Sequence, residues 1–165
     1  MAILFSTEFK IKTPIINKLG VFDALLDEDS NFFINIKRLQ TTKVPEFSGS
    51  YKRVNDYFHN IGILLKAAKP YDINYRSALK HFNFPEVNGI NLGFSTSKRG
   101  AGFGIKLRDK IIKDAYDIIQ SGSEQPEIFH LTGLFEENVG PDRLSDMVAR
   151  IIANDIYSYS KRIYK

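Results

Sequence analysis

The segment of this chain with the clearest chemical potential is KRGAGFGIKLRDKIIK, which begins at Lys98 and ends at Lys113. Glycines occupy three alternate positions and are followed directly by a helical pattern. A glycine-rich turn that leads into a helix exposes backbone N–H groups and the positive end of the helix dipole, which together suit an anion. We therefore predict a phosphate or nucleic-acid site formed by Lys98, Arg99, Gly100, Gly102, Gly104, Lys106 and Arg108.

The glycine spacing of this segment matches neither of two common phosphate-binding motifs. A P-loop needs Gly-Lys-Ser/Thr after its glycines, and the dinucleotide fingerprint needs G-x-G-x-x-G after a hydrophobic strand. The sequence here reads G-x-G-x-G without such a strand. The alternative explanation is a tight, close-packed turn in which side chains do not fit.

A second group of residues has the composition of a magnesium site. Asp142 and Asp146 are four positions apart and would share one face of a helix, and Glu136 or Glu137 precedes them in a turn. Carboxylates arranged in this way bind Mg²⁺ together with water and a substrate phosphate, so the alternative function is a metal-dependent nuclease or related phosphodiesterase. The competing explanation is structural, because Asp142 suits the helix dipole and Asp146 can pair with Arg150. Apart from this Mg²⁺, we expect no cofactor.

Composition limits the classes of protein to which the chain can belong. Its 165 residues are 43% hydrophobic and 25% charged, as in a globular domain, and the net charge of +4 permits an anionic partner. The absence of cysteine excludes disulfides, zinc ribbons and thiol catalysis. No apolar run approaches the roughly 18 residues that span a bilayer, so no membrane association is expected. These features predict a cytoplasmic protein.

The charges are distributed unevenly along the chain. Residues 32–80 carry nine Lys and Arg against three acids, and residues 98–113 carry six against one. Residues 114–155 reverse the balance, with nine acids against two arginines. The basic part favours contact with a polyanion, whereas the acidic part supports a third hypothesis, a protein-interaction or oligomerisation domain.

Hydrophobic periodicity predicts a mainly α fold, a single helical domain over residues 1–165 with a small two-stranded β element near the N-terminus. Alternation predicts the two short strands at Leu4–Ile11 and Phe32–Lys37. A helix is predicted over Tyr51–Ala68, capped by Ser48 or Ser50. The glycine- and asparagine-rich segment from Phe84 to Gly104 is predicted to be a long ordered loop, and three further helices follow it. The predicted helices span Thr13 to Gly20, Tyr51–Ala68, Tyr75–Phe82, Ile105–Gln120, Pro126–Phe135 and Pro141 to about Tyr164.

Two turns resemble parts of the helix-hairpin-helix motif of DNA-binding proteins. The sequence NVGPDRL looks like its hairpin, although Asn138 replaces the first glycine and Asp142 stands where a small or basic residue favours phosphate. The GFG sequence at Gly102–Gly104 is a second partial match, and there the following helix is basic. The resemblance implies contact with DNA phosphates.

A longer resemblance concerns the segments GINLGFSTSKRGAGFG and LTGLFEENVGPDRLSDM. They are similar to the N-terminal region of a group of poorly characterised bacterial proteins associated with mobile elements and phage defence. This similarity covers the chain from about Tyr51 onward and implies a DNA-binding or regulatory module without naming a catalytic residue. It also implies that the chain is the N-terminal part of a longer protein with a further C-terminal domain, as does the uninterrupted helical pattern after Pro141.

Overall fold

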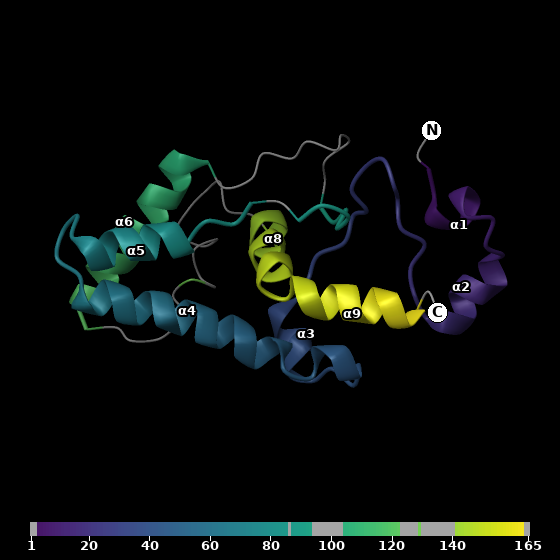
Figure 1. Cartoon of the computed structure of the whole chain (residues 1–165), viewed down its shortest axis with the longest axis horizontal. Helices are drawn as coiled ribbons and strands as arrows, with labels where there is room; N and C mark the ends of the chain where they lie inside the picture. Colours follow the sequence, from purple (N-terminus) through teal and green to yellow (C-terminus); the bar gives the residue numbers. More distant parts are fainter. Residues whose placement is uncertain (1–2, 86, 94–103, 123–128, 130–140, 164–165) are drawn as a thin grey trace.

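The computed structural model describes residues 3–85, 87–93, 104–122, 129 and 141–163, without the side chains of residues 141 and 142. The mainly helical fold predicted from the sequence is confirmed (Figure 1). The described helical elements are α1 (Phe5–Glu8), α2 (Thr13–Leu19), α3 (Ile36–Gln40), the 3-10 turn η1 (Pro45–Phe47), α4 (Ser50–Ala67), α5 (Ile73–His81), α6 (Ile105–Gln120), α8 (Pro141–Ile151) and α9 (Ala153–Ile163).

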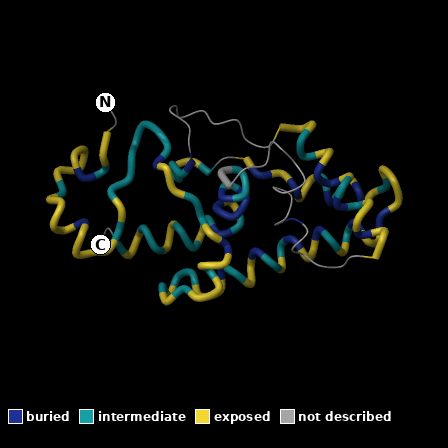
Figure 2. The backbone as a smooth tube through the Cα atoms, turned by 180° about the vertical axis from the view of Figure 1, so that it is seen from behind, coloured by how far each residue is buried: buried dark blue, intermediate teal, exposed yellow. Residues whose placement is uncertain are grey.

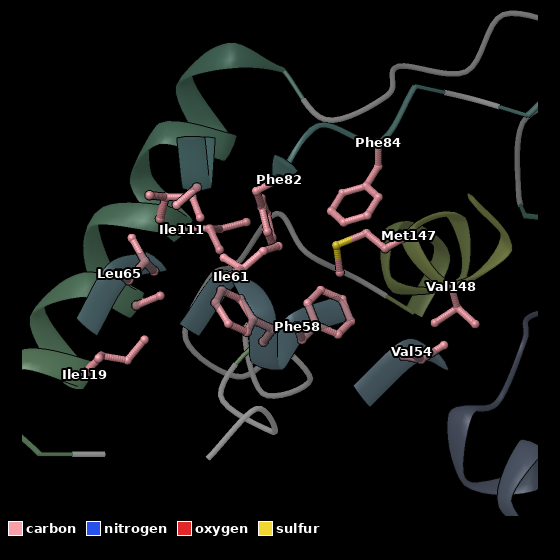
Figure 3. Close-up of a cluster of buried hydrophobic side chains, with 14 of the residues drawn as sticks. Val54, Phe58, Ile61, Leu65, Phe82, Phe84, Ile111, Ile119, Met147 and Val148 are labelled. Carbon is pink, nitrogen blue, oxygen red and sulfur yellow. The ribbon is translucent and has the colours of Figure 1, made fainter. Parts of the chain in front are cut away.

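Helix α4 is the centre of the hydrophobic core. Its residues Val54, Phe58, Ile61 and Leu65 recur every three or four positions, and all four side chains are buried. Helices α3, α5, α6 and α8 all pack against α4. Figure 3 shows the α4 side chains converging with side chains from α6 and α8, and Phe58 also stacks on Phe129 with ring centroids 5.3 Å apart.

Helices α5 and α6 are fixed to α4 by polar contacts at their ends. The Asp72 side chain accepts hydrogen bonds from the backbone N–H of Tyr75 and of Lys69, so it caps α5 and closes the turn from α4. At the far end of α6, the Gln120 amide donates to the carbonyl of Leu65 at 3.0 Å. These contacts satisfy backbone groups that helix ends leave without partners.

The two strands predicted near the N-terminus were wrong. Residues Phe5–Glu8 form α1, and Phe32–Lys37 continues from irregular backbone into α3. In the described part of the chain, pairing of strand type is limited to two isolated bridges, Leu4 with Leu25 and Ser30 with Leu92. In both segments, local polar contacts determine the backbone conformation instead of the alternation of apolar and polar residues that predicted strands.

Those local contacts involve Ser6 and Asn35. The backbone N–H and the hydroxyl group of Ser6 both donate to the carboxylate of Asp23, which holds the α1 segment against residues 21–27. The Asn35 side chain accepts from the backbone N–H of Lys37 and Arg38, and thereby starts a helix where the pattern predicted a strand.

The long C-terminal helix predicted from Pro141 is divided in two. Ile152 lies in a turn between α8 and α9 and is buried against the core, and Figure 1 shows the two helices running in clearly different directions. Helix α9 is held by the Arg162 guanidinium, which donates to both carboxylate oxygens of Glu46, and by the ring of Tyr159 against Phe47. Tertiary contacts therefore redirect a segment whose pattern alone suggests one helix.

The two ends of the molecule differ in how much of their backbone is buried. Figure 1 places α4, α5 and α6 at one end and α1 and α2 at the other, with α8 between them. Figure 2 shows that the buried backbone belongs mainly to the end with α4–α6 and to α8. None of the helices in the described residues has both the length and the apolar character needed to cross a bilayer.

Candidate anion-binding surface

The start of α6 is the described part of the predicted phosphate site. Gly104 is its N-cap residue, with extended backbone and no side chain that caps the helix. The first N–H groups of an α-helix have no partner within the helix, so they are directed at whatever lies beyond the cap. Gly104, Ile105 and Lys106 are exposed, Ile105 by 70%. Figure 1 shows this first turn extending past α5.

Gly104 is not required by close packing. Among the described residues, no atom lies within 4 Å of a Cβ atom added there, and the φ angle of −61° is one that every residue type adopts. The described residues therefore give no support to the tight-turn explanation at this glycine. Of the other predicted site residues, Lys98, Arg99, Gly100 and Gly102 lie outside the described residues.

The two predicted cations on α6 have different environments. Lys106 is exposed. Arg108 is half-buried and donates from Nε and Nη2 to Oδ1 of its neighbour Asp109, at 3.1 and 2.9 Å. The exposed Lys106 is therefore available to an anion at the helix start, whereas Arg108 would first have to break its hydrogen bonds to Asp109.

A row of lysines follows one side of α6 from its first turn. Lys106, Lys110 and Lys113 are spaced by four and three residues, which places them on one face, and all three are exposed. Lys113 pairs with Asp117 at 2.7 Å, and that hydrogen bond raises the pKa of the Lys113 ammonium group. The row is thus a line of exposed lysines, the last of which is paired with a carboxylate.

The sequence analysis missed a cluster of tyrosines where this lysine row ends. The ring of Tyr75 in α5 lies 5.6 Å from the ring of Tyr116 in α6 and 5.6 Å from that of Tyr71. Burial raises the pKa of the Tyr75 phenol, and the Lys113 charge opposes that effect slightly. In the sequence, these residues are visible only as three separate tyrosines: Tyr71 in the turn before α5, Tyr75 in the first turn of α5 and Tyr116 on α6. No local motif links those positions, so only the packing of α5 on α6 reveals them.

The predicted magnesium site is described only in part. Glu136 and Glu137 lie outside the described residues, as does the side chain of Asp142. Asp146 is partly buried on α8, where it has an interaction partner. Among the side chains that the structure describes, no three His, Cys, Asp or Glu residues are grouped so that they could hold a metal ion.

Comparison with known proteins assigns the chain to a domain family for which no activity is described. The family model described as "Domain of unknown function (DUF8370)" matches residues 10–165, which is nearly the whole chain. No curated protein and no solved structure matches the chain.

Proposed function

The chain belongs to the DUF8370 family of domains of unknown function, and we propose that it is a binding module for the phosphate groups of a nucleic acid. The observation that supports the proposal is the exposed start of α6, where the N-cap residue Gly104 has no side chain to cap the helix and Lys106 is exposed in the first turn. Helix N-termini of this kind bind phosphate through both hydrogen bonds and the helix dipole.

The charges of the described helices support a polyanion rather than a single small anion. Exposed lysines continue from Lys106 along the face of α6 that carries Lys110 and Lys113, although Lys113 is paired with Asp117. Phosphates repeat along a nucleic-acid strand, so a line of cations can neutralise several of them at once. The mobile-element and phage-defence context implied by the sequence resemblance makes foreign nucleic acid the proposed ligand in the cell.

The proposal is tested by the salt dependence of binding. Fluorescently labelled duplex DNA and single-stranded DNA and RNA are titrated with the protein between about 50 and 200 mM salt, where phosphate contacts lose affinity steeply. Lys106→Gln should weaken binding to all sequences alike and reduce the slope of log K against log salt by about 1. Lys98→Ala combined with Arg99→Ala should reduce it further.

Lys161→Gln is the matched control, because Lys161 is an equally exposed lysine on α9, at a distance from α6 (Figure 1). It should leave the slope nearly unchanged. If the wild-type protein binds neither duplex nor single strands, or if the Lys106 and Lys161 variants behave alike, the α6 start is not a nucleic-acid site.

A second candidate function, self-association, is favoured by a separate observation. Several large apolar side chains are exposed along the N-terminal region, and exposed apolar patches commonly mark interfaces. The exposed set comprises Ile3, Leu4, Phe9, Ile15, Leu19, Phe22 and Phe32. The rings of Phe22 and Phe32 contact each other with centroids 4.8 Å apart, so they form a joint surface.

The partner that we propose for this N-terminal surface is a second copy of the chain, since closed homo-oligomers are the commonest assemblies. Light scattering over a wide concentration range should then show dimers or larger species, and Phe22→Ser with Phe32→Ser should return them to monomers. A wild-type protein that stays monomeric throughout would exclude this function.

A further inference from the structure

The turn between α4 and α5 presents one aromatic side chain to solvent in an unusual way. Tyr71 has a φ angle of 62°, in the left-handed region that side chains other than those of Gly, Asn and Asp rarely adopt. Its side chain is 78% exposed. A strained backbone that exposes a large ring gains nothing for the core, so such an outlier justifies a hypothesis of function.

The Tyr71 ring is supported from inside the protein. It contacts the ring of Tyr75, which is only 7% exposed and in turn contacts Tyr116 of α6. The next apolar residue, Ile73, is 68% exposed beside the same turn. Tyr71 is therefore the exposed ring of the tyrosine cluster, and it rests on the buried ring of Tyr75.

The sequence on both sides of Tyr71 is rich in exposed cations. Exposed cations precede and follow Tyr71 in the sequence, and the segment contains one acid, Asp72. The Asp72 carboxylate accepts backbone hydrogen bonds from Tyr75 and Lys69, which lower its pKa and direct its oxygens toward the backbone. The cations are Lys66, Lys69, Arg76 and Lys80.

The charged groups of α6 that act on the Tyr75 hydroxyl add no unbalanced negative charge. Asp117 is paired with Lys113, and Asp109 accepts hydrogen bonds from Arg108. An exposed ring in a segment rich in exposed cations suits a ligand that has flat bases and regular phosphates more closely than it suits an apolar peptide.

We propose that Tyr71 is a stacking platform for an unpaired base of a single-stranded nucleic acid whose phosphates contact the cations around the turn. This inference rests on the proposed function and specifies its ligand. Stacking on an aromatic ring tolerates any base, because every base has a π face, so the contact adds affinity without sequence preference. In a duplex the bases are paired and stacked on each other, so they are not available to the ring.

The same strand can reach from the Tyr71 turn toward the start of α6. Tyr116 near the end of α6 contacts Tyr75, and the lysine row of Lys106, Lys110 and Lys113 leads back to Gly104. The sixteen residues of α6 rise about 24 Å, which about seven nucleotides cover at the roughly 3.4 Å spacing of a stacked strand, and fewer cover if the strand is extended. An oligonucleotide of about 12 nucleotides is therefore long enough, and its length falls within the range of known single-strand sites.

The experiment uses a single strand of that length with 2-aminopurine at an internal position, since the fluorescence of this base falls when it stacks on an aromatic ring. Tyr71→Asn removes the ring and keeps a residue that tolerates left-handed backbone. It should weaken single-strand binding about 5- to 150-fold and abolish the change in 2-aminopurine fluorescence. Tyr71→Phe keeps a ring and should retain both, and duplex binding should be the same in all variants.

Tyr157→Ala is the matched control, because Tyr157 is an exposed tyrosine on α9. The two proposals fail differently. If the wild-type protein binds no nucleic acid, the proposed function falls and this inference falls with it. If the wild-type protein binds single strands but Tyr71→Asn leaves affinity and fluorescence unchanged, the inference is overturned while nucleic-acid binding stands.

Discussion

The hydroxyl group of Ser50 donates a hydrogen bond to Oδ2 of Asp155 at 2.6 Å, across 105 residues of sequence. Ser50 lies in the first turn of α4 and is completely buried, whereas Asp155 lies in the first turn of α9. Nη2 of Arg53 binds the same carboxylate at 2.8 and 2.9 Å. This contact fixes α9 to α4 just after the turn at Ile152, and so helps to position the C-terminal helix.

We expect Asp155→Ala to lower the free energy of unfolding by about 1–3 kcal/mol, because it leaves the buried Ser50 hydroxyl without its acceptor. Urea denaturation measures the change. Asp56→Ala is the control, since Asp56 forms an exposed pair with Lys52 on α4 and such pairs contribute less than about 1 kcal/mol. Equal losses in the two variants would contradict the importance of the Ser50–Asp155 contact.

Phe58→Ala should lower the free energy of unfolding more than Asp155→Ala does. The ring is fully buried at the centre of the cluster in Figure 3 and packs against the rings of Phe82, Phe84 and Phe129. Removing it leaves a cavity and should cost about 3–5 kcal/mol. Ile63→Ala on the same helix removes a side chain that is half exposed and should cost about 0.5 kcal/mol or less. Thermal unfolding of both variants compares them directly, and a small Phe58 effect would be inconsistent with this core.

Asp72→Asn should change the pH dependence of stability. The folded-state pKa of Asp72 lies below its ordinary value of 3.8, chiefly because the carboxylate accepts the backbone hydrogen bond of Tyr75. Its contribution to stability is therefore complete above 3.8 and disappears as the pH falls through the lower, folded-state pKa. Asparagine caps helices about as well as aspartate, so the substitution isolates the charge.

The unfolding free energies of wild type and Asp72→Asn are compared by urea denaturation from neutral pH to values below 3.8. We expect wild type to be more stable at neutral pH and the difference to shrink in acid. A difference that stays constant over that interval would mean that the Asp72 charge does not contribute.

The parts of the fold that the sequence predicted are those in which periodicity and packing agree. Helices α4 and α6 match their predicted ranges to within a residue, because their apolar positions at helical spacing face a common core. The predictions failed where a polar side chain decides the backbone, as Asn35 does at the start of α3. Ser50, predicted as a cap of α4, instead lies inside the helix and reaches Asp155, and no local pattern reveals such a long-range partner.

The candidate site was predictable only as far as it is local. The glycine and lysine spacing around Gly104 and Lys106 is visible in the sequence, and the structure shows both residues exposed at a helix start. The tyrosine row depends on how α5 packs on α6, and the exposure of Tyr71 depends on one backbone angle. Neither the packing of α5 on α6 nor the φ angle of Tyr71 can be predicted from the composition or the hydrophobic periodicity of the sequence.

The glycines at the two ends of α6 provide the last prediction, because they differ in what they require. Gly104 has a φ angle of −61° and, among the described residues, no atom within 4 Å of an added Cβ atom, whereas Gly122 has a φ angle of 105°. Gly104→Ala should therefore leave the fold intact and change stability by less than about 1 kcal/mol, while Gly122→Ala should destabilise it by more than that. Chemical denaturation of the two variants measures the contrast.

The same pair separates packing from binding at the predicted phosphate site. If the absence of a side chain at Gly104 serves the approach of an anion, replacing Gly104 with a bulky residue such as Ile should weaken nucleic-acid binding while stability changes little. The corresponding Gly122→Ala variant, measured at a temperature where it remains folded, should bind like wild type because it lies at the opposite end of α6. A Gly104→Ile variant that unfolds readily would show instead that this glycine is needed for packing.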